Sequence, residues 1–370
     1  PLFPTGYFIL HLMTIKEQTK ALWKRCFNDS DDFTDLYFRL RYSEEVNQTL
    51  KEGNEVIAAL QMLPYPMTFC GRTVPTSYIS GACTHPDHRN RGAMRTLLAH
   101  SFERMRQEGI LFSTLIPAEP WLFNYYGRLG YATVFSYATE EVTPLRTDGP
   151  SRSPVDKSAA DCKATAAQTS EISVRPVEEY DKNIYDYLNI HLAGRPCCIQ
   201  HTPDDFHVVL ADLKLGSGRL LVASKGASVQ GMVFLYRQEA EMVISEWLAD
   251  DDCTEQRLRE AVFQLNEGKR ILRLLPPSEG YPSHPLGMAR LINVPAVLQL
   301  YAAAFPQEEH RWAVTDELLP LNNGYYLLSE GTCTYGKTPL SEPYEHIGIS
   351  ELTQRLLTPL RPYMSLMLNK

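Results

Sequence analysis

The sequence predicts an α/β (α+β) protein of several domains, with mixed sheets covered by helices. The chain has 370 residues, more than a single hydrophobic core usually organises. An amphipathic helix expected over Gly92–Gln107 lies between apolar, β-branched runs that are typical of buried strands. A segment over 146–173 is poor in large apolar residues and is interpreted as a linker. Strands alternating with helices on both sides of a linker favour layered α/β domains.

The first domain, 13–145, has the clearest succession of elements. Its helices are expected at 17–27, 92–107 and 119–129, and its strands at 56–63, 72–83, 110–116 and 131–135. The acidic segment Asn28–Asp32 interrupts the first helical pattern and is expected to form a loop. The order strand, loop, helix, strand, helix, strand predicts a mixed sheet that helices cover.

Two further domains are expected after the linker. In the second, 174–285, strands are expected at 219–224, 231–237 and 243–248, before a helix at 255–265. In the third, 286–370, helices are expected at 294–305 and 350–357, with short strands at 311–315, 324–329 and 331–334. The second domain is therefore a mixed α/β unit and the third a small α+β unit.

Composition argues against several classes of function. The formal net charge of -8 leaves no broad basic field, so nucleic acid is not an expected partner, whereas an amine-bearing substrate suits this charge. No apolar run reaches the roughly 18 residues that a membrane helix needs. No C-x-x-C spacing or histidine cluster accompanies the eight cysteines, so we expect free thiols, no metal and a cytoplasmic location.

The chain ends need separate treatment. Residues 1–12 are apolar but lack the basic leading region of a signal peptide. Met13 and the residues after it read like a natural start, so residues 1–12 are left out of the functional argument.

The most informative segment runs from Thr84 to Arg95, where an expected strand passes into the central helix. Unpaired N–H groups and the positive end of the helix dipole favour a pyrophosphate there. Gly92 lets the backbone approach closely, and Arg89, Arg91 and Arg95 add positive charge. The alternative is a basic, solvated helix start with a glycine in a tight turn.

Two motifs carry a resemblance to a known family. Arg89-x-x-Gly92-x-Met94 resembles motif A of the GNAT acetyltransferases, which has Arg or Gln, two residues, Gly, one residue, then Gly or Ala. Met94 departs from that pattern but is similar to the enhanced intracellular survival (Eis) subfamily, where a larger apolar residue is common. That subfamily also has a downstream motif that resembles the segment from Tyr126 to Tyr131, Tyr-Gly-Arg-Leu-Gly-Tyr.

The resemblance implies acetyl-coenzyme A as cosubstrate and assigns roles to particular residues. Tyr126 would protonate the departing thiolate; the alternatives are that Tyr126 is a packing aromatic or that Tyr125 has this role. The resemblance also implies that the C-terminal carboxylate, at Lys370, would act as a base or anchor. Glu119 would polarise the incoming amine or merely cap the next helix. The expected coenzyme contacts are Ala82, Cys83, Thr84, Arg89, Asn90, Arg91, Gly92, Ala93, Met94 and Arg95, with Cys83 a bystander rather than a nucleophile.

The other two thirds of the chain fit the same resemblance. The second domain would be a degenerate GNAT copy, because it lacks an Arg-x-x-Gly turn before a helix. The third resembles a reduced sterol carrier protein-like domain, and the family implies a homo-oligomer. The sequence thus predicts tandem GNAT folds and acetyl transfer to a primary amine of a small molecule or peptide. The alternatives are a lipid or small-ligand carrier or scaffold, and a tandem-GNAT enzyme that uses a longer acyl or aminoacyl donor.

Overall fold

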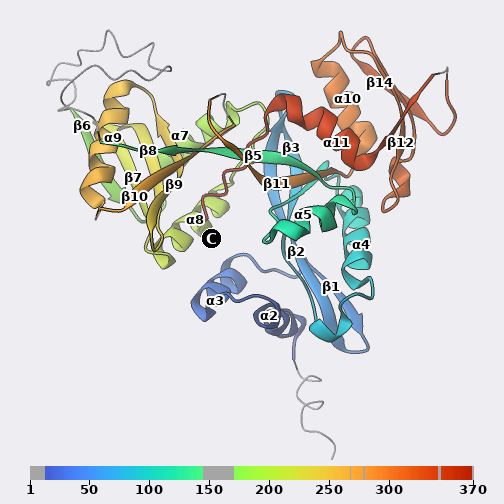
Figure 1. The fold of residues 1–370 in the computed structure, drawn as a ribbon, viewed down its shortest axis with the longest axis horizontal. Coiled ribbons are helices and arrows are strands. Elements are labelled where there is room, and N and C mark those ends of the chain that lie inside the picture. Colours follow the sequence, from blue (N-terminus) through green and yellow to red (C-terminus); the bar gives the residue numbers. More distant parts are fainter. Residues whose placement is uncertain (1–12, 145–170, 267, 278–279, 341–342, 369–370) are drawn as a thin grey trace, which may run out of the picture. The chain divides into compact units, whose positions relative to one another are not determined.

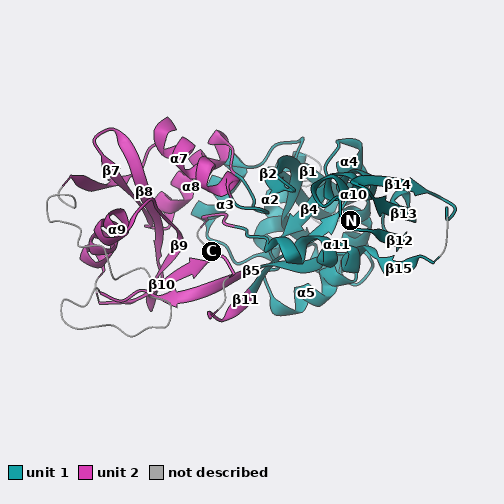
Figure 2. Ribbon diagram, turned by 90° about the horizontal axis from the view of Figure 1, so that it is seen from above, with its two compact units in different colours: residues 1–136, 195–200, 285–364 teal, residues 137–194, 201–284, 365–370 magenta. Residues whose placement is uncertain are grey.

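The structure is a computed structural model that describes residues 13–144, 171–266, 268–277, 280–340 and 343–368 (Figure 1). Most of the expected linker, residues 1–12 and Lys370 lie outside these described residues. The described chain forms two compact units (Figure 2). Unit 1 comprises the described parts of residues 1–136, 195–200 and 285–364, and unit 2 comprises those of 137–194, 201–284 and 365–370.

Unit 1 is built around a mixed sheet. Its strands follow the order β1-β2-β3-β4-β11-β5. Their bounds are Asn47–Glu52 for β1, Glu55–Phe69 for β2, Arg72–Thr84 for β3, Phe112–Leu115 for β4, Ser283–Leu291 for β11 and Ala132–Glu141 for β5, of which β5 and β11 continue into unit 2. The helices of this part are α2 (Ile15–Cys26), α3 (Asp31–Leu40), α4 (Ala93–Gln107) and α5 (Pro120–Gly127). The predicted mixed α/β architecture is confirmed.

Helix α4 packs on this sheet as its sequence pattern predicts. Leu97, Leu98, Phe102 and Met105 recur on one stripe and are buried, together with Leu60 of β2. Glu108 and Gly109 end the helix, and Gly109 has a positive φ of 75°. This packing fixes the amino end of α4 directly after β3.

Strand β3 changes partner along its length. It pairs with β2 up to Thr84, but its parallel pairing with β4 ends at Tyr78. Strand β3 also has a bulge at Gly81 and Ala82. Ala59 of β2 lies opposite Cys83 and Gln61 lies opposite Ser80, so two residues of β3 face the single residue between them on β2. Gly81 has a φ of 57°, which glycine adopts readily.

We expect Gly81→Ala to destabilise unit 1 strongly. A Cβ at this position would lie 2.0 Å from Cζ3 of Trp23 and 2.6 Å from Oε1 of Gln61. Overpacking costs about 1–3 kcal/mol, in addition to the strain of a positive φ. Urea unfolding measures the loss, with Gly53→Ala as control, because Gly53 has a φ of 59° and open space around it. Equal losses in the two variants would contradict the steric argument.

Residues 285–364, most of the expected third domain, belong to unit 1. A second sheet has the order β14-β13-β12-β15, with bounds Thr332–Gly336, Gly324–Ser329, His310–Thr315 and Glu345–Gly348. Helices α10 (Val294–Ala304) and α11 (Ile349–Leu357) accompany it. The sequence places a separate domain at 286–370, whereas β11 pairs with β4, from Met288 opposite Leu115 to Leu291 opposite Phe112. The unit boundary therefore differs from the expected one, because this pairing joins segments far apart in the sequence.

Unit 2 also contains a mixed sheet, and part of its order of helices and strands along the chain is the same as in unit 1. Its strands follow the order β5-β10-β9-β8-β7-β6, with bounds Arg270–Leu275 for β10, Glu241–Ala249 for β9, Ser228–Arg237 for β8, Arg219–Lys225 for β7 and Ile172–Val177 for β6. Its helices are α7 (Lys182–Ala193), α8 (Pro203–Leu215) and α9 (Asp252–Leu265). Two helices, three antiparallel strands, a helix and a parallel strand occur in both units. The two units thus share this order of elements, although no helix like α5 lies between β10 and β11 among the described residues, and a second GNAT-like domain stays a prediction.

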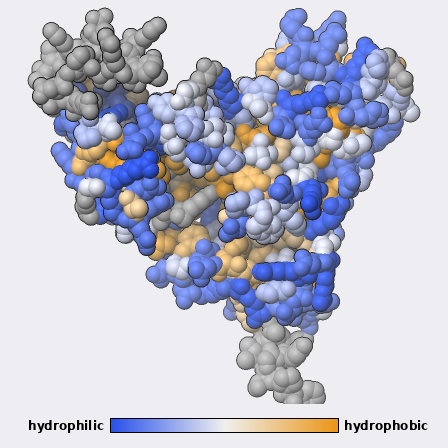
Figure 3. Space-filling model, in the orientation of Figure 1, coloured by the Kyte–Doolittle hydropathy of each residue, from blue (hydrophilic) through white to orange (hydrophobic). Residues whose placement is uncertain are grey.

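The surface carries mainly polar residues over the C-terminal sheet. In Figure 3, hydrophilic residues predominate over α10 and β14 at the upper right. None of the helices in the described ranges is both long and apolar enough to cross a membrane.

Candidate active site

The turn between β3 and α4 leaves backbone donors exposed. Asn90 has a φ of 62° and Gly92, the N-cap of α4, a φ of 80°. No side chain caps the helix, and no acidic residue lies in its first turn. The first helical bond runs from the Thr96 N–H to the Gly92 carbonyl, so the N–H groups of Ala93 to Arg95 precede the hydrogen-bonded part of the helix.

The donors of this turn fit the pyrophosphate of coenzyme A. A Cβ built on Gly92 would meet no atom within 4 Å, so the space beside the turn is open. Backbone N–H groups at the amino end of a long helix stabilise anions through their own charge and the helix dipole. The backbone of Asn90–Met94 has the geometry that an anion site needs, and phosphate binding at this turn stays a prediction.

The three arginines of the turn have different surroundings. Arg89 Nε donates to the Thr84 carbonyl oxygen over 3.2 Å, and its Nη2 lies 3.8 Å from Cys26 Sγ. Arg95 Nη2 pairs with Glu317 Oε2 at 3.2 Å. Arg91 is exposed and makes no side-chain hydrogen bond or ion pair within the described chain. Arg91 is thus the cation of the three that is free to meet a phosphate without giving up a partner.

The edge of β3 beyond Tyr78 is open to a ligand. Along Ile79–Cys83, no strand among the described residues pairs with the side that faces β4 earlier in the strand. Extended ligands add to such an edge through main-chain hydrogen bonds. The Thr84 carbonyl is already engaged by Arg89, and the Cys83 side chain is buried against α2. Of the three expected residues, Ala82 is therefore the best placed to offer its main chain.

Tyr126 lies near the end of α5 and is buried, with 8% of its surface exposed. Its ring packs against those of Tyr125 and Tyr131, at centroid distances of 5.3 and 5.7 Å. Burial raises the pKa of Tyr126 well above its usual value, and the nearby Tyr125 and Cys83 add to the rise. Tyr126 belongs to the same buried cluster as Ile79 of β3, and Ala82 packs against that cluster. A phenol with a raised pKa keeps its proton at neutral pH and can donate it.

Further tyrosines near Tyr126 escaped the sequence analysis. Burial raises the pKa of Tyr78 and Tyr37, and each of these phenols also interacts electrostatically with Tyr65. The Ile116 N–H hydrogen-bonds to Tyr78, whose pKa Tyr126 raises further. The cluster draws on α3, β2, β3 and α5, so no local motif signals it.

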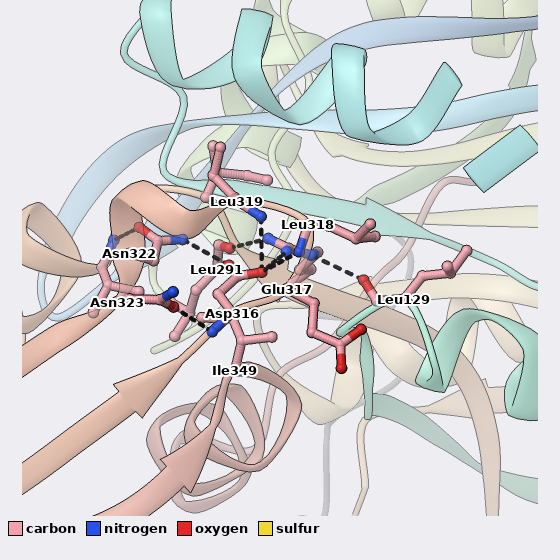
Figure 4. Close-up of polar contacts among 12 residues, drawn as sticks. Leu129, Leu291, Asp316, Glu317, Leu318, Leu319, Asn322, Asn323 and Ile349 are labelled. Carbon is pink, nitrogen blue, oxygen red and sulfur yellow. Dashed lines mark hydrogen bonds and ion pairs between the residues drawn. The ribbon is translucent and has the colours of Figure 1, made fainter. Parts of the chain in front are cut away.

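The turn that follows Tyr126 is held by a buried ion pair (Figure 4). Arg290 Nε donates to the Leu129 carbonyl over 3.0 Å, and its Nη2 contacts Asp316 Oδ1 at 2.5 Å. Gly130 fits this arrangement, because a Cβ there would lie 2.9 Å from Arg290 Nε and 2.7 Å from Cγ2 of Ile349. The sequence analysis missed Arg290, although a lone arginine in the apolar strand Met288–Ile292 is a signal for a buried partner.

The remaining candidates have less support. Glu119 is exposed and occupies the N-cap of α5 without making a side-chain cap hydrogen bond. Lys370 lies outside the described residues. His85 and His88 follow β3, and imidazole is a common general base, but each has a partner of its own: His85 is buried and contacts Arg25 through Nε2, and His88 lies 3.4 Å from Glu52. Among the described residues, no group of three or more His, Cys, Asp or Glu could hold a metal ion.

The helix start without a side-chain cap, the unpaired strand edge and the buried phenol all lie in the segment that matches a known family. Residues 14–134 match the family model of the acetyltransferase (GNAT) domain. The chain therefore carries a GNAT acetyltransferase domain, and its enzyme class is that of the acetyltransferases. Such a domain implies the use of acetyl-coenzyme A. No curated protein matches the chain.

Solved structures share the fold over most of the chain. A GCN5-related N-acetyltransferase from Kribbella flavida is 18% identical, with a TM-score of 0.67, over 94% of each chain. One from Anabaena variabilis is 16% identical, with a TM-score of 0.69, over 94% of this chain and 96% of that one. Eis1 from Mycobacterium abscessus is 16% identical, with a TM-score of 0.66, over 92% and 87%. At these identities the likeness concerns the fold.

Proposed function

We propose that the protein transfers the acetyl group of acetyl-coenzyme A to a primary amine by direct attack, within the first domain, 13–145. The observation that carries this proposal is the uncapped, basic turn before α4 together with the buried phenol of Tyr126 on α5, which packs in one cluster with Ile79 of β3. The turn binds the pyrophosphate through the N–H groups of Asn90–Met94 and the charge of Arg91. Ala82 aligns the pantetheine arm along the edge of β3.

The protein supplies two groups to the chemical step. Bound acetyl-coenzyme A provides a thioester that an uncharged amine can attack. Backbone N–H groups of β3 beyond Tyr78 stabilise the negative charge on the carbonyl oxygen, and Tyr126 gives its proton to the departing sulfur. The amine loses its proton during the attack, and Glu119 is a weaker candidate for the group that orients the amine.

The second copy of the fold does not bind the coenzyme in this proposal. In unit 2, helix α9 begins after Asp251, whose side chain caps the Thr254 N–H at 2.7 Å. Asp252 and Glu255 place further negative charge in its first turn. A capped and acidic helix start repels a pyrophosphate, in contrast to the start of α4.

The finer assignments rest on the resemblance. We propose an Eis-like enzyme in which the sheet of β12 to β15, with α10 and α11, corresponds to a reduced sterol carrier protein-like domain, and in which the chain forms a homo-oligomer. The tyrosine cluster of Tyr37, Tyr65 and Tyr78 suits an acceptor that carries an amine and hydroxyl or amide groups. Competition between acetyl- and longer acyl-coenzyme A would identify a donor with a longer chain.

Calorimetric titration with acetyl-coenzyme A tests the proposal. We expect saturable binding that Arg91→Glu weakens by about tenfold or more, since a hydrogen bond to a charged group contributes about 1.5–3 kcal/mol. Arg72→Glu is the matched control, because Arg72 is also exposed and begins β3 at the end remote from the turn. An absence of binding would favour a carrier or scaffold, and equal losses in both variants would exclude this turn as the site.

A further inference from the structure

Two cysteines that are distant in the sequence, Cys26 and Cys83, lie close together beside the turn between β3 and α4. Cys26, the last residue of α2, packs against a buried cluster that contains Leu22, Val56 and Cys83. The Cys83 thiol hydrogen-bonds to Cys26. Cys26 is half-buried, whereas only 5% of Cys83 is exposed. One sulfur can therefore be reached by a small reagent, and the other lies behind it.

The groups around Cys26 are cationic or neutral. Arg89 Nη2 lies 3.8 Å from its sulfur, and Arg25, which contacts His85, adds a second charge. The Cys26 thiol donates to the Thr84 carbonyl over 3.3 Å, which favours the protonated thiol, and the same carbonyl also accepts from Arg89 Nε. The hydrogen bond from Cys83 lowers the pKa of Cys26 most, burial opposes this shift, and the two arginines add to it, which together bring the pKa to about 6. The lowered pKa gives Cys26 more thiolate character at neutral pH than an ordinary cysteine has.

The other thiols provide an internal comparison. Cys70 and Cys333 are also partly exposed, but burial raises their pKa to about 12. The hydrogen bond to Cys26 raises the pKa of Cys83, and burial adds to the rise. Thiolate character and access together decide which cysteine an oxidant attacks. Both conditions are met at Cys26.

We propose that Cys26 is a modification site for hydroperoxides and that Cys83 resolves the oxidised sulfur as a disulfide. The Cys26 thiolate attacks a peroxide oxygen; an S–O bond forms, the O–O bond breaks, and the sulfur becomes a sulfenic acid while the leaving oxygen takes a proton. The Cys83 sulfur then attacks Cys26, and the hydroxide leaves with the Cys83 proton as water. Overall, two thiols and one hydrogen peroxide give one disulfide and two waters.

Arg89 connects Cys26 with the turn between β3 and α4. In the reduced protein the Arg89 guanidinium faces the Cys26 sulfur and the Thr84 carbonyl. Oxidation removes the negative charge of Cys26 and leaves Arg89 with the carbonyl alone. The chemistry at Cys26 goes beyond the proposed function and does not depend on it, so calorimetry on the reduced protein tests the function separately.

Peptide mass spectrometry after hydrogen peroxide treatment of the reduced full chain tests the proposal. We expect a Cys26–Cys83 disulfide as the first cross-link, and in Cys83→Ser a Cys26 sulfenic acid that dimedone traps. Cys70→Ser is the control and should leave the cross-link unchanged. A first disulfide between other cysteines, or equal oxidation of Cys70 and Cys26, would overturn the proposal.

The pH dependence of alkylation gives a second measurement. We expect the iodoacetamide reaction of Cys26 to rise with a midpoint near the pKa of about 6, against roughly 8.5 for an ordinary cysteine. Arg89→Gln should move this midpoint upward and slow the oxidation, because it removes one of the two cations. A Cys26 midpoint at the ordinary value in the unaltered chain would refute the reactive thiolate.

Discussion

Replacement of Tyr126 by phenylalanine is expected to lower the turnover of acetyl transfer by roughly 100- to 10,000-fold, the usual contribution of a general acid. The ring is buried among Tyr125 and Tyr131, so phenylalanine keeps the packing and removes only the proton donor. Binding of acetyl-coenzyme A should change little, because the phenol acts on the leaving sulfur. Thiol release with a reactive amine measures turnover, and calorimetry measures binding.

The control for this variant is Tyr125→Phe. Tyr125 is less buried, and the charge of Arg95 opposes the rise that burial causes in its pKa. We expect Tyr125→Phe to retain most of the turnover. If Tyr125→Phe loses turnover while Tyr126→Phe does not, the proton donor is Tyr125 and the assignment changes.

The pH profile is a second check on Tyr126. Burial raises its pKa above the ordinary value of about 10, so the neutral, donating form persists to higher pH than for an exposed tyrosine. At every pH below about 10 the phenol should therefore keep its proton, and kcat should not fall because of its ionisation. A fall in kcat at lower pH that disappears in Tyr126→Phe would show that the phenol ionises more easily than its burial implies.

Local patterns were sufficient to predict much of unit 1. The apolar stripe of α4 and the glycine that precedes it are both determined by neighbouring residues, and both are found where expected. Helix α3 was missed, because Asp31 and Asp32 were interpreted as part of a loop. In the structure Ser30 caps this helix through the Phe33 N–H, and the two aspartates lie in its first turn, where the helix dipole stabilises acidic groups.

Contacts between distant segments could not be predicted in the same way. The pairing of β11 with β4 joins the C-terminal segment to the sheet of the first domain, and nothing in either strand's own sequence specifies the partner. The meeting of Cys26 with Cys83 has the same origin. The sequence also does not show which partner each side chain contacts. Arg89, Arg91 and Arg95 look alike in the sequence, yet only Arg91 lacks a side-chain partner among the described residues.

The largest stability effect is expected for Asp316→Asn. Asp316 and Arg290 have almost no exposed side-chain surface, and burial lowers the pKa of Arg290 while the carboxylate opposes that shift. Removal of one partner of such a pair leaves a buried charge uncompensated and costs about 3–5 kcal/mol. Asp316 also accepts from the backbone N–H groups of Leu318 and Leu319, which hold the turn before β13. Urea unfolding should show the loss directly.

The neighbouring residue supplies the matched control. Glu317 also pairs with an arginine, Arg95, but both side chains of that pair are largely exposed, so Glu317→Gln should change the free energy of unfolding by less than about 1 kcal/mol. The double variant Arg290→Met with Asp316→Asn should be less destabilised than the sum of the single changes, because no charge is then left alone in the core. Equal effects of Asp316→Asn and Glu317→Gln would mean that Arg290 finds water or another partner. In that case the turn after Tyr126 would depend on Gly130 and the contact with Ile349 rather than on this ion pair.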